Sequence, residues 1–236
     1  MPESLPEVRL VEAGPFGHPA VEHDWPQQAG ACRALQKALS TYVNTVDDLP
    51  PVRRLGGVDI GFEDGGRITR AAAVVLDAQT LEVIDTQLAR VPTRIPYIPG
   101  LLSFREIPGA LAALERLATL PDLILVDGHG IAHPRRLGVA THLGLVTGLP
   151  TIGVAKKRLT GSYEQPPDER GAWAELQDRD ETIGAVLRSR VGVKPIFISP
   201  GHRIGLESAL SFTMSALTRY RLPETTRVAD KLASNR

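Results

Sequence analysis

Leu123–Val126 is a run of four aliphatic residues that leads directly into Asp127. A run this short and wholly apolar is typical of a strand inside a sheet that is covered on both faces. The carboxylate at the end of the run has two explanations. Asp127 caps the turn where the strand stops, or the strand holds the acid still so that it binds a metal ion.

The segment before this run predicts a three-stranded antiparallel meander. Three stretches rich in β-branched and apolar residues are separated by turn sequences at 63–66 and 77–80. They cover Arg54–Phe62, Ile68–Leu76 and Glu82–Val91. The three consecutive alanines at 71–73 indicate that another element packs closely against the second strand.

Helices and strands alternate after the meander. Apolar periodicity predicts helices at about 26–46, 103–119, 135–147, 206–220 and 225–233. Further strands are predicted at 151–154, 182–190 and 195–198, the last two as a hairpin, and the polar stretch 166–180 is predicted to be a loop. A meander followed by alternating helices and parallel strands predicts a ribonuclease H-like α/β fold, in which helices flank a mixed sheet. Other α/β layouts fit the same pattern.

Composition limits the setting of this domain. No run approaches 18 apolar residues, so no membrane span is expected, and the N-terminus lacks the features of a secretory signal. Cys32 is the only cysteine, which excludes an internal disulfide and a cysteine zinc cluster and fits a reducing cytoplasm.

Charge is distributed unevenly although the formal net charge is zero. Residues 128–163 contain five arginines and lysines and no acid. This excess suits a polyanionic partner, and the alternative is a solvated basic loop.

Two acids lie within or at the end of apolar strands, where burying a carboxylate without a partner is energetically unfavourable. Asp59 lies in the middle of the first meander strand, and Asp127 ends the later strand. If both strands are central and adjacent, the two carboxylates meet at one edge of the sheet, where they repel unless a cation lies between them. Oxygen ligands favour Mg²⁺ or Mn²⁺ over zinc. The alternative is two unrelated turn acids.

A proline-rich loop precedes the helix predicted at 103–119. Pro96 and Pro99 flank Tyr97 and stiffen the loop, and a stiff loop that presents an aromatic ring suits insertion between stacked bases. Ser103 and Glu106 have the spacing of a helix capping box. The functional alternative for Glu106 is a third carboxylate at the metal site.

Several long motifs resemble the endonuclease V family, the deoxyinosine 3′-endonucleases. They are GVDIGFE at 57–63, PYIPGLLSFRE at 96–106, DGHGIAHPRRLGVATHLG at 127–144, GVAKKRL at 153–159 and YRLPETTRVAD at 220–230. The resemblance covers roughly residues 28–235. It implies a ribonuclease H-like nuclease domain at 28–236, preceded by an irregular N-terminal extension at 1–27.

The resemblance also implies a role for each motif residue. It places Asp59, Glu106 and Asp127 as Mg²⁺ ligands, with Mn²⁺ able to substitute, and adds Asp230 and Lys156 to the catalytic set. The remaining expectations concern DNA. With the resemblance, the loop residues Pro96, Tyr97, Ile98 and Pro99 form a wedge, and Leu102, Gly128 and Gly138 form the base pocket, with ordinary turn geometry as the alternative. From their charge and position, the side chains expected to contact backbone phosphates are those of His133, Arg135, Arg136 and His202, with a turn histidine as the alternative for His133.

The implied reaction is hydrolysis of the second phosphodiester bond on the 3′ side of inosine. The implied partner is inosine-containing DNA, and inosine-containing RNA is a second candidate. A monomer in the cytoplasm is expected. Two rivals stay open: an ATP-binding phosphotransferase of the sugar-kinase and actin type, and a module that binds modified nucleic acid without cutting it. A ribonuclease H-like nuclease of another kind explains the PYIPG loop poorly.

Overall fold

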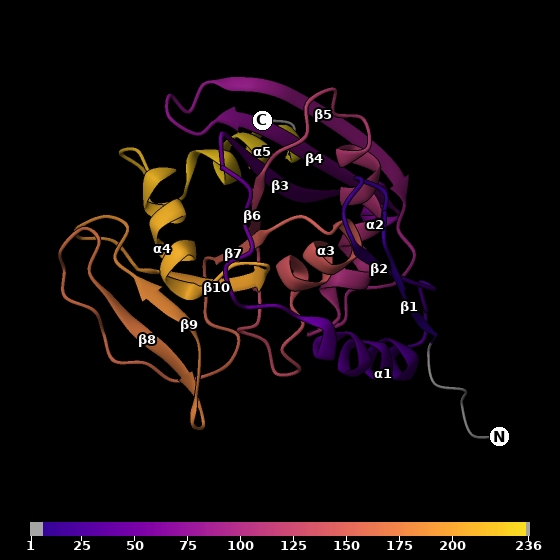
Figure 1. Cartoon of the computed structure of the whole chain (residues 1–236), viewed down its shortest axis with the longest axis horizontal. Coiled ribbons are helices and arrows are strands. Elements are labelled where there is room, and N and C mark those ends of the chain that lie inside the picture. The colour runs from indigo at the N-terminus through magenta and orange to yellow at the C-terminus, as the bar shows by residue number, and fades with distance from the viewer. Residues whose placement is uncertain (1–6, 235–236) are drawn as a thin grey trace.

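The computed structural model describes residues 7–234 and is built around one eight-stranded mixed sheet. Its strand order is β5-β4-β3-β6-β7-β10-β9-β8. β3 (Arg54–Glu63), β6 (Leu123–Asp127) and β7 (Thr151–Ala155) run parallel, and the other neighbouring pairs are antiparallel. The remaining strands are β4 (Ile68–Asp77), β5 (Val83–Pro92), β8 (Trp173–Asp178), β9 (Glu181–Leu187) and β10 (Ile196–His202). The predicted ribonuclease H-like sheet is confirmed (Figure 1).

Two pairs of helices cover the two faces of the sheet. α2 (Leu102–Leu114) and α3 (Val139–Thr147) pack on one face, and α4 (Leu206–Ser215) and α5 (Glu224–Ala233) pack on the other. β4 shows the division clearly, because Ala71 and Ala73 belong to the core cluster of α2 whereas Ala72 packs with α5. The small side chains at 71–73 therefore face close helices, as their sequence predicts.

Gly57 lets α5 approach β3 more closely than any other residue would. A Cβ atom at this position would lie 2.4 Å from the backbone oxygen of Thr225. The first turn of α5 therefore rests directly on the backbone of β3, the strand that carries Asp59. This contact fixes the position of Asp230 farther along the same helix.

Several predicted boundaries and one predicted loop differ from the structure, and α4, predicted to run to 220, ends at Ser215. α1 (Ala29–Leu39) and the short η1 (Ser40–Tyr42) replace the helix predicted to run to 46, α2 ends at Leu114, and α3 begins only after Gly138. The segment 166–180, predicted to be a loop, contains β8. β8 is an edge strand with a single buried side chain, Leu176, so its sequence lacks the apolar alternation of a central strand.

The N-terminal segment is more ordered than its sequence predicts. β1 (Val8–Val11) and β2 (Ala20–His23) form a two-stranded antiparallel sheet, and Val21 and Phe16 are buried in the core. Residues 1–6 of the predicted extension and residues 235–236 of the predicted domain lie outside the described residues. The segment 7–27 is thus packed against the body of the protein, with β2 beside α3 and β1 on the outer side of β2 (Figure 1).

A buried hydrogen-bond relay joins this segment to α2. His23 Nδ1 lies 2.7 Å from the carbonyl oxygen of Asp24, to which only an N–H can donate. The neutral His23 ring therefore accepts at Nε2 from His142 Nε2–H at 2.7 Å, and His142 Nδ1 accepts from the Ser103 hydroxyl at 3.0 Å. Burial lowers the pKa of both histidines, which keeps them neutral. Trp25 stacks on His142 at 5.3 Å between ring centroids.

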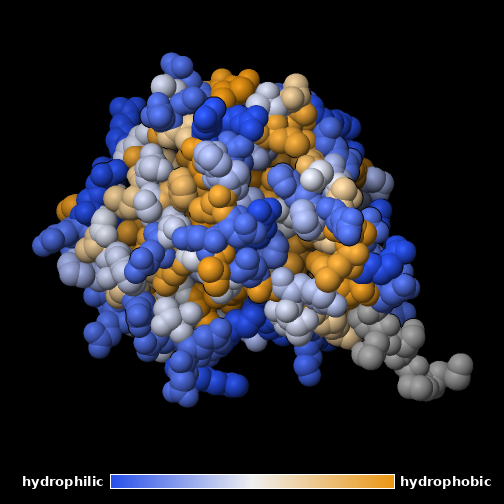
Figure 2. Space-filling model, in the orientation of Figure 1, coloured by the Kyte–Doolittle hydropathy of each residue, from blue (hydrophilic) through white to orange (hydrophobic). Residues whose placement is uncertain are grey.

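The surface of the protein is mixed in character. Figure 2 shows hydrophilic and hydrophobic residues interspersed over the visible face, with hydrophilic residues at the tip of the β8–β9 hairpin at the lower left. Within residues 7–234, no helix combines the length and the hydropathy that crossing a membrane requires.

Candidate active site

Asp59 and Asp127 meet because their strands are parallel neighbours in matched register. Val58 pairs with Val126, so the next residue of each strand is one of the two acids. β6 ends at Asp127, whereas β3 continues to Glu63, which leaves both carboxylates beside open space at the end of β6. The prediction that the two acids lie at one edge of the sheet is therefore met in the structure.

Two helices bring further acids to the same place. Glu106 on α2 and Asp230 on α5 line the same cavity as Asp59 and Asp127. This cavity has a volume of about 310 Å³. α2 and α5 lie on opposite faces of the sheet, so the cavity is closed from both sides beyond the end of β6. Glu106 does not take part in a capping box, because α2 begins at Leu102 and Ser103 bonds to His142.

The pKa values of the acids reflect their crowding. Desolvation, followed by the charge of Asp127, raises the pKa of Asp59 to about 7. Desolvation also raises the pKa of Glu106 to about 8, with the charges of Asp59 and Asp127 adding to the shift. Carboxylates that hold protons near neutral pH lack enough positive charge around them, as expected of a site that takes up a cation.

Lys156 supplies the positive charge nearest to these acids. It follows β7 directly, and its Nζ lies 2.5 Å from Asp127 Oδ2. Desolvation works against the ammonium, but the hydrogen bond and the charge of Asp127 outweigh it and raise the pKa of Lys156. The lysine thus remains protonated and directed at the acids from the neighbouring strand.

The acids suit a hard divalent cation by their chemistry. Four carboxyl groups around one cavity offer only oxygen ligands, the donor type that Mg²⁺ and Mn²⁺ prefer. Their present side-chain positions are less converged than ligation requires: within residues 7–234, no three His, Cys, Asp or Glu side chains are arranged to hold one ion. The Lys156 ion pair holds the Asp127 carboxylate against the ammonium.

A second cavity adjoins the first. It has a volume of about 180 Å³ and shares Glu106 and Asp127 with the acid-lined cavity. The three residues predicted to form a base pocket all line it, namely Leu102, Gly128 and Gly138. A Cβ atom at Gly138 would lie 2.2 Å from the backbone oxygen of His129, so only glycine allows the wall of this cavity to close.

The predicted wedge stands at the rim of the second cavity. Tyr97 and Pro99 line the cavity. The Tyr97 side chain is 62% exposed, and a large aromatic side chain is more often buried on average. Pro96 and Ile98 belong to the same irregular loop between β5 and α2. The base of the loop is fixed at Gly100, whose carbonyl oxygen faces three donor groups within 3.2 Å: Gln36 Nε2, His133 Nε2 and Arg135 Nη2.

Gln36 is a site residue that the sequence reasoning missed. Its side chain is 1% exposed, lines the second cavity and donates to the carbonyl oxygens of Gly100 and Leu137, while its own oxygen accepts from Arg135 Nε at 2.6 Å. A glutamine beside Leu35 and Leu39, on the buried side of an amphipathic helix, was the available signal. A buried amide of this kind needs partners and therefore indicates a structural or binding role.

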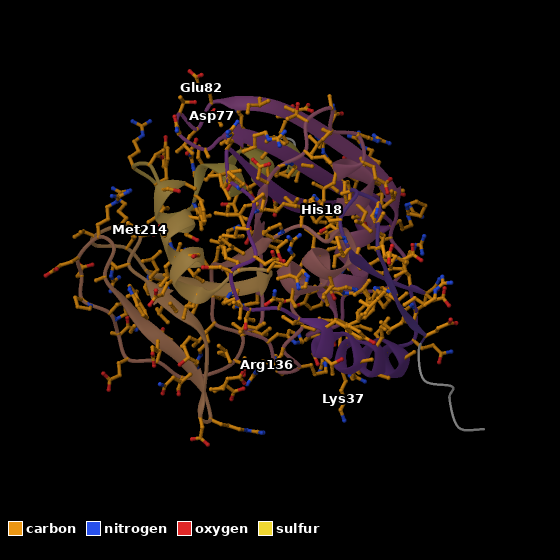
Figure 3. All side chains as sticks on the ribbon, viewed as in Figure 1. His18, Lys37, Asp77, Glu82, Arg136 and Met214 are labelled. Carbon is orange, nitrogen blue, oxygen red and sulfur yellow. The ribbon has the colours of Figure 1, made fainter. Side chains whose placement is uncertain are left out.

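The two arginines predicted to contact phosphates are engaged inside the protein. Arg135 fixes Gly100, as described above. Arg136 forms ion pairs with Asp178 and Glu181 at the tip of the β8–β9 hairpin (Figure 3). The residues that neutralise Arg136 lie in or beside a strand that was predicted to be loop, so this pairing was not visible in the sequence.

The two histidines predicted to contact phosphates differ in their surroundings. His133 is 3% exposed, bonds to Gly100 and Arg135, and has its pKa lowered to about 4 by desolvation and by the charge of Arg135. His202 pairs with Thr151 at the start of β7, which is the end of that strand opposite Lys156. β10 continues through the sequence SPGH, which resembles a loop, so His202 lies away from the acids and its contact with a phosphate stays a prediction.

Comparisons with known proteins agree with this arrangement. A family model described as Endonuclease V matches residues 37–231. Endonuclease V of Azotobacter vinelandii is 55% identical over 222 residues, covering 94% of this chain and 98% of the relative. The crystal structure of endonuclease V from Streptomyces avermitilis superposes with a TM-score of 0.85 at 48% identity, covering 89% and 93% of the two chains.

A more distant relative was crystallised with nucleic acid. Endonuclease V of Ciona intestinalis, in complex with a 23-mer DNA containing an inosine followed by a ribo-adenosine, superposes with a TM-score of 0.77 at 26% identity, covering 87% of this chain and 95% of that one. The parallel strands that end in acids, the stiff aromatic loop and the agreement over nearly the whole length lead to one conclusion. The chain belongs to the endonuclease V family.

Proposed function

We propose that this protein is a repair endonuclease that recognises deoxyinosine in DNA and hydrolyses the second phosphodiester bond on its 3′ side. Mg²⁺ is the proposed cation, with Mn²⁺ able to substitute. The observation that carries the proposal is the adjacency of two cavities that share Glu106 and Asp127, one lined by acids and one by the wedge loop and glycines.

The acid-lined cavity would carry out the hydrolysis. Asp59, Glu106 and Asp127 would hold the cation, with Asp230 beside them, and a bound cation supplies charge for activating water and for stabilising the phosphate. Lys156 would move its ammonium from Asp127 toward the scissile phosphate as that phosphate enters, offering positive charge where negative charge develops. Glu106 and Asp59 would release their protons as the cation binds.

The second cavity would select the base. Inosine pairs weakly, so moving it out of the stack takes less free energy than moving a normal base. Tyr97 would fill the space left behind, and the backbone around Gly128 and Gly138 would approach the extruded base closely. The absence of a 2-amino group distinguishes hypoxanthine from guanine, which a close-fitting wall excludes by size.

One gel tests this function directly. Inosine-containing DNA and RNA strands, each with Mg²⁺ or with EDTA, are incubated with the protein and the cleavage position is mapped. We expect Mg²⁺-dependent cleavage of the DNA strand at the second bond 3′ to inosine. Cutting at random positions, or binding without cutting, would reject the proposal, and the RNA lanes show whether that strand is also a substrate.

Tyr97 provides a second prediction. Replacing it by alanine removes a base-stacking partner worth about 1–3 kcal/mol, so we expect the preference for inosine-containing over adenine-containing strands to fall by about 10-fold to 100-fold. Competition binding of the two strands measures this ratio. Tyr42→Ala is the matched control, because Tyr42 is also an exposed tyrosine but lies on η1. Equal preference in the Tyr97 variant and the wild type would remove the wedge role.

A further inference from the structure

A third and larger cavity lies next to the acids. It has a volume of about 640 Å³. Residues of the segment after β7, of the loop before β8 and of the segment that joins β9 to β10 line it. We call it the basic cavity. Its charged lining residues are Lys156, Lys157, Arg158, Asp168, Arg188 and Lys194.

Positive charge in the basic cavity is largely unmatched by the protein. Asp168 is the one acid in the lining, and it is already engaged by Arg188 Nε at 3.2 Å and by the backbone N–H of Gly192 at 3.0 Å. Within residues 7–234, Lys157, Arg158 and Lys194 form no ion pair. Cations gathered around a cavity without counter-charges favour an anionic ligand.

A single side chain fixes the two walls of the basic cavity. The Arg221 guanidinium donates to the carbonyl oxygens of Lys156, Lys194 and Pro195, at 2.9, 2.7 and 2.9 Å. Lys156 and Lys194 are therefore held on backbone segments of set separation. The aromatic rings of Tyr163 and Phe197 meet edge to face at 5.5 Å between centroids and form an apolar part of the same lining.

The acid-lined cavity adjoins both of the others, which share no lining residue with each other. The base-sized cavity shares Glu106 and Asp127 with the acid-lined cavity, and the acid-lined cavity shares Lys156 with the basic cavity. A strand that places its inosine in the first and its scissile phosphate in the second is directed toward the third. Since the proposed cut lies on the 3′ side of inosine, the strand enters the basic cavity in the 3′ direction.

We infer that the basic cavity binds the phosphodiester backbone of the substrate strand on the 3′ side of the bond that is cut. The inference rests on the proposed function. Lys157 and Lys194 contact phosphates there, and Tyr163 lies against a sugar or a base. Contacts of this kind supply affinity and register without sequence preference.

The test varies the length of the strand and the charge of the cavity together. Single-stranded DNA with one inosine carries either 1 or 10 nucleotides beyond the cut, and KM is measured with wild type and with Lys157→Ala/Lys194→Ala. We expect wild-type KM to rise about 10-fold or more when the 3′ arm is trimmed. The double variant has a raised KM for the long strand and little further change on trimming.

Salt dependence gives an independent measure of the same contacts. Each phosphate contact with a single strand contributes about 0.7 to the slope of log affinity against log salt, so the double variant should lose about 1.4 from that slope. Lys37→Ala is the matched control, because Lys37 is an exposed lysine on α1 that points away from the body of the protein (Figure 3). Its slope and arm dependence should equal those of the wild type.

Two outcomes separate the inference from the function on which it rests. Wild-type cleavage at inosine, with the double variant still responding to the 3′ arm as the wild type does, overturns the inference alone. Failure of the wild type to cleave inosine-containing DNA overturns the proposed function and the inference together. A thermal unfolding curve equal to that of the wild type shows that the double variant is folded.

Discussion

Replacing Asp127 by asparagine is expected to lower the rate of DNA cleavage by at least about 1,000-fold. Asparagine keeps the size of the side chain but removes the negative charge that would hold the cation and that now pairs with Lys156. Loss of one group that stabilises a charged transition state lowers rates by about 100-fold to 1,000-fold, and weakened cation binding adds to this loss. Single-turnover cleavage of an inosine-containing strand measures the rate.

The same variant should still bind that strand. The residues of the wedge loop and the glycines of the second cavity are unchanged, so affinity measured by fluorescence anisotropy should stay within a few-fold of the wild-type value. Asp180→Asn is the matched control, since Asp180 is an exposed acid between β8 and β9 and should retain full activity. Cleavage by Asp127→Asn within about 10-fold of the wild type would exclude Asp127 from the chemistry.

Glu106→Gln is expected to stabilise the fold while abolishing activity. The pKa of Glu106 is raised to about 8, so the folded protein binds a proton that the unfolded chain releases above its ordinary value near 4.5. The stability that this proton provides is fully present below pH 4.5 and is lost as the pH rises toward and through 8. Glutamine is neutral at every pH and removes that loss.

The expected gain at pH 8, without added cation, is on the order of 4 kcal/mol in the free energy of unfolding, or about 10 °C in Tm for a domain of this size. At pH 5 the difference should nearly vanish. Thermal unfolding at both pH values measures it. Glu115→Gln is the matched control, because Glu115 is an exposed residue at the end of α2. A lower Tm for Glu106→Gln at pH 8 would contradict the crowding of acids described here.

Added Mg²⁺ offers a readout that does not depend on activity. A cation that binds the folded protein but not the unfolded chain stabilises the fold by mass action. The wild-type Tm at pH 8 should therefore rise with Mg²⁺ concentration, and the Tm of Glu106→Gln should rise much less, because one ligand is missing and the repulsion that Mg²⁺ relieves is already reduced.

The pairing of Asp59 with Asp127 could be predicted because both acids belong to strands with a clear apolar sequence pattern. The apolar run before Asp127 and the acid within the first meander strand specify two buried parallel strands, and their register brings Asp59 beside Asp127. The family motifs favoured the metal-site role of Glu106 over the capping box and added Lys156 and Asp230, and these three residues come from two helices and a third strand end. Sequence spacing alone does not show that these elements meet.

The surroundings of Arg136 and His202 could not have been predicted from the sequence. The charge of Arg136 is matched by two acids more than 40 residues away, Asp178 at the end of the weakly patterned edge strand β8 and Glu181 at the start of β9. His202 follows proline and glycine, which usually end a strand, yet β10 continues through both with an irregularity in its register. Gln36 went unnoticed because its partners lie in loops whose conformation the sequence does not determine.

The relay from His23 through His142 to Ser103 makes the beginning of the chain part of the catalytic scaffold. A truncated protein starting at residue 37, where the family match begins, would lack His23 and Trp25. The imidazole of His142 would then lose the acceptor of its Nε2–H, and this imidazole bonds to Ser103, which lies one helical turn before Glu106 on α2. A truncated protein that starts where the family match starts would therefore lack contacts that hold the α2–α3 region in place.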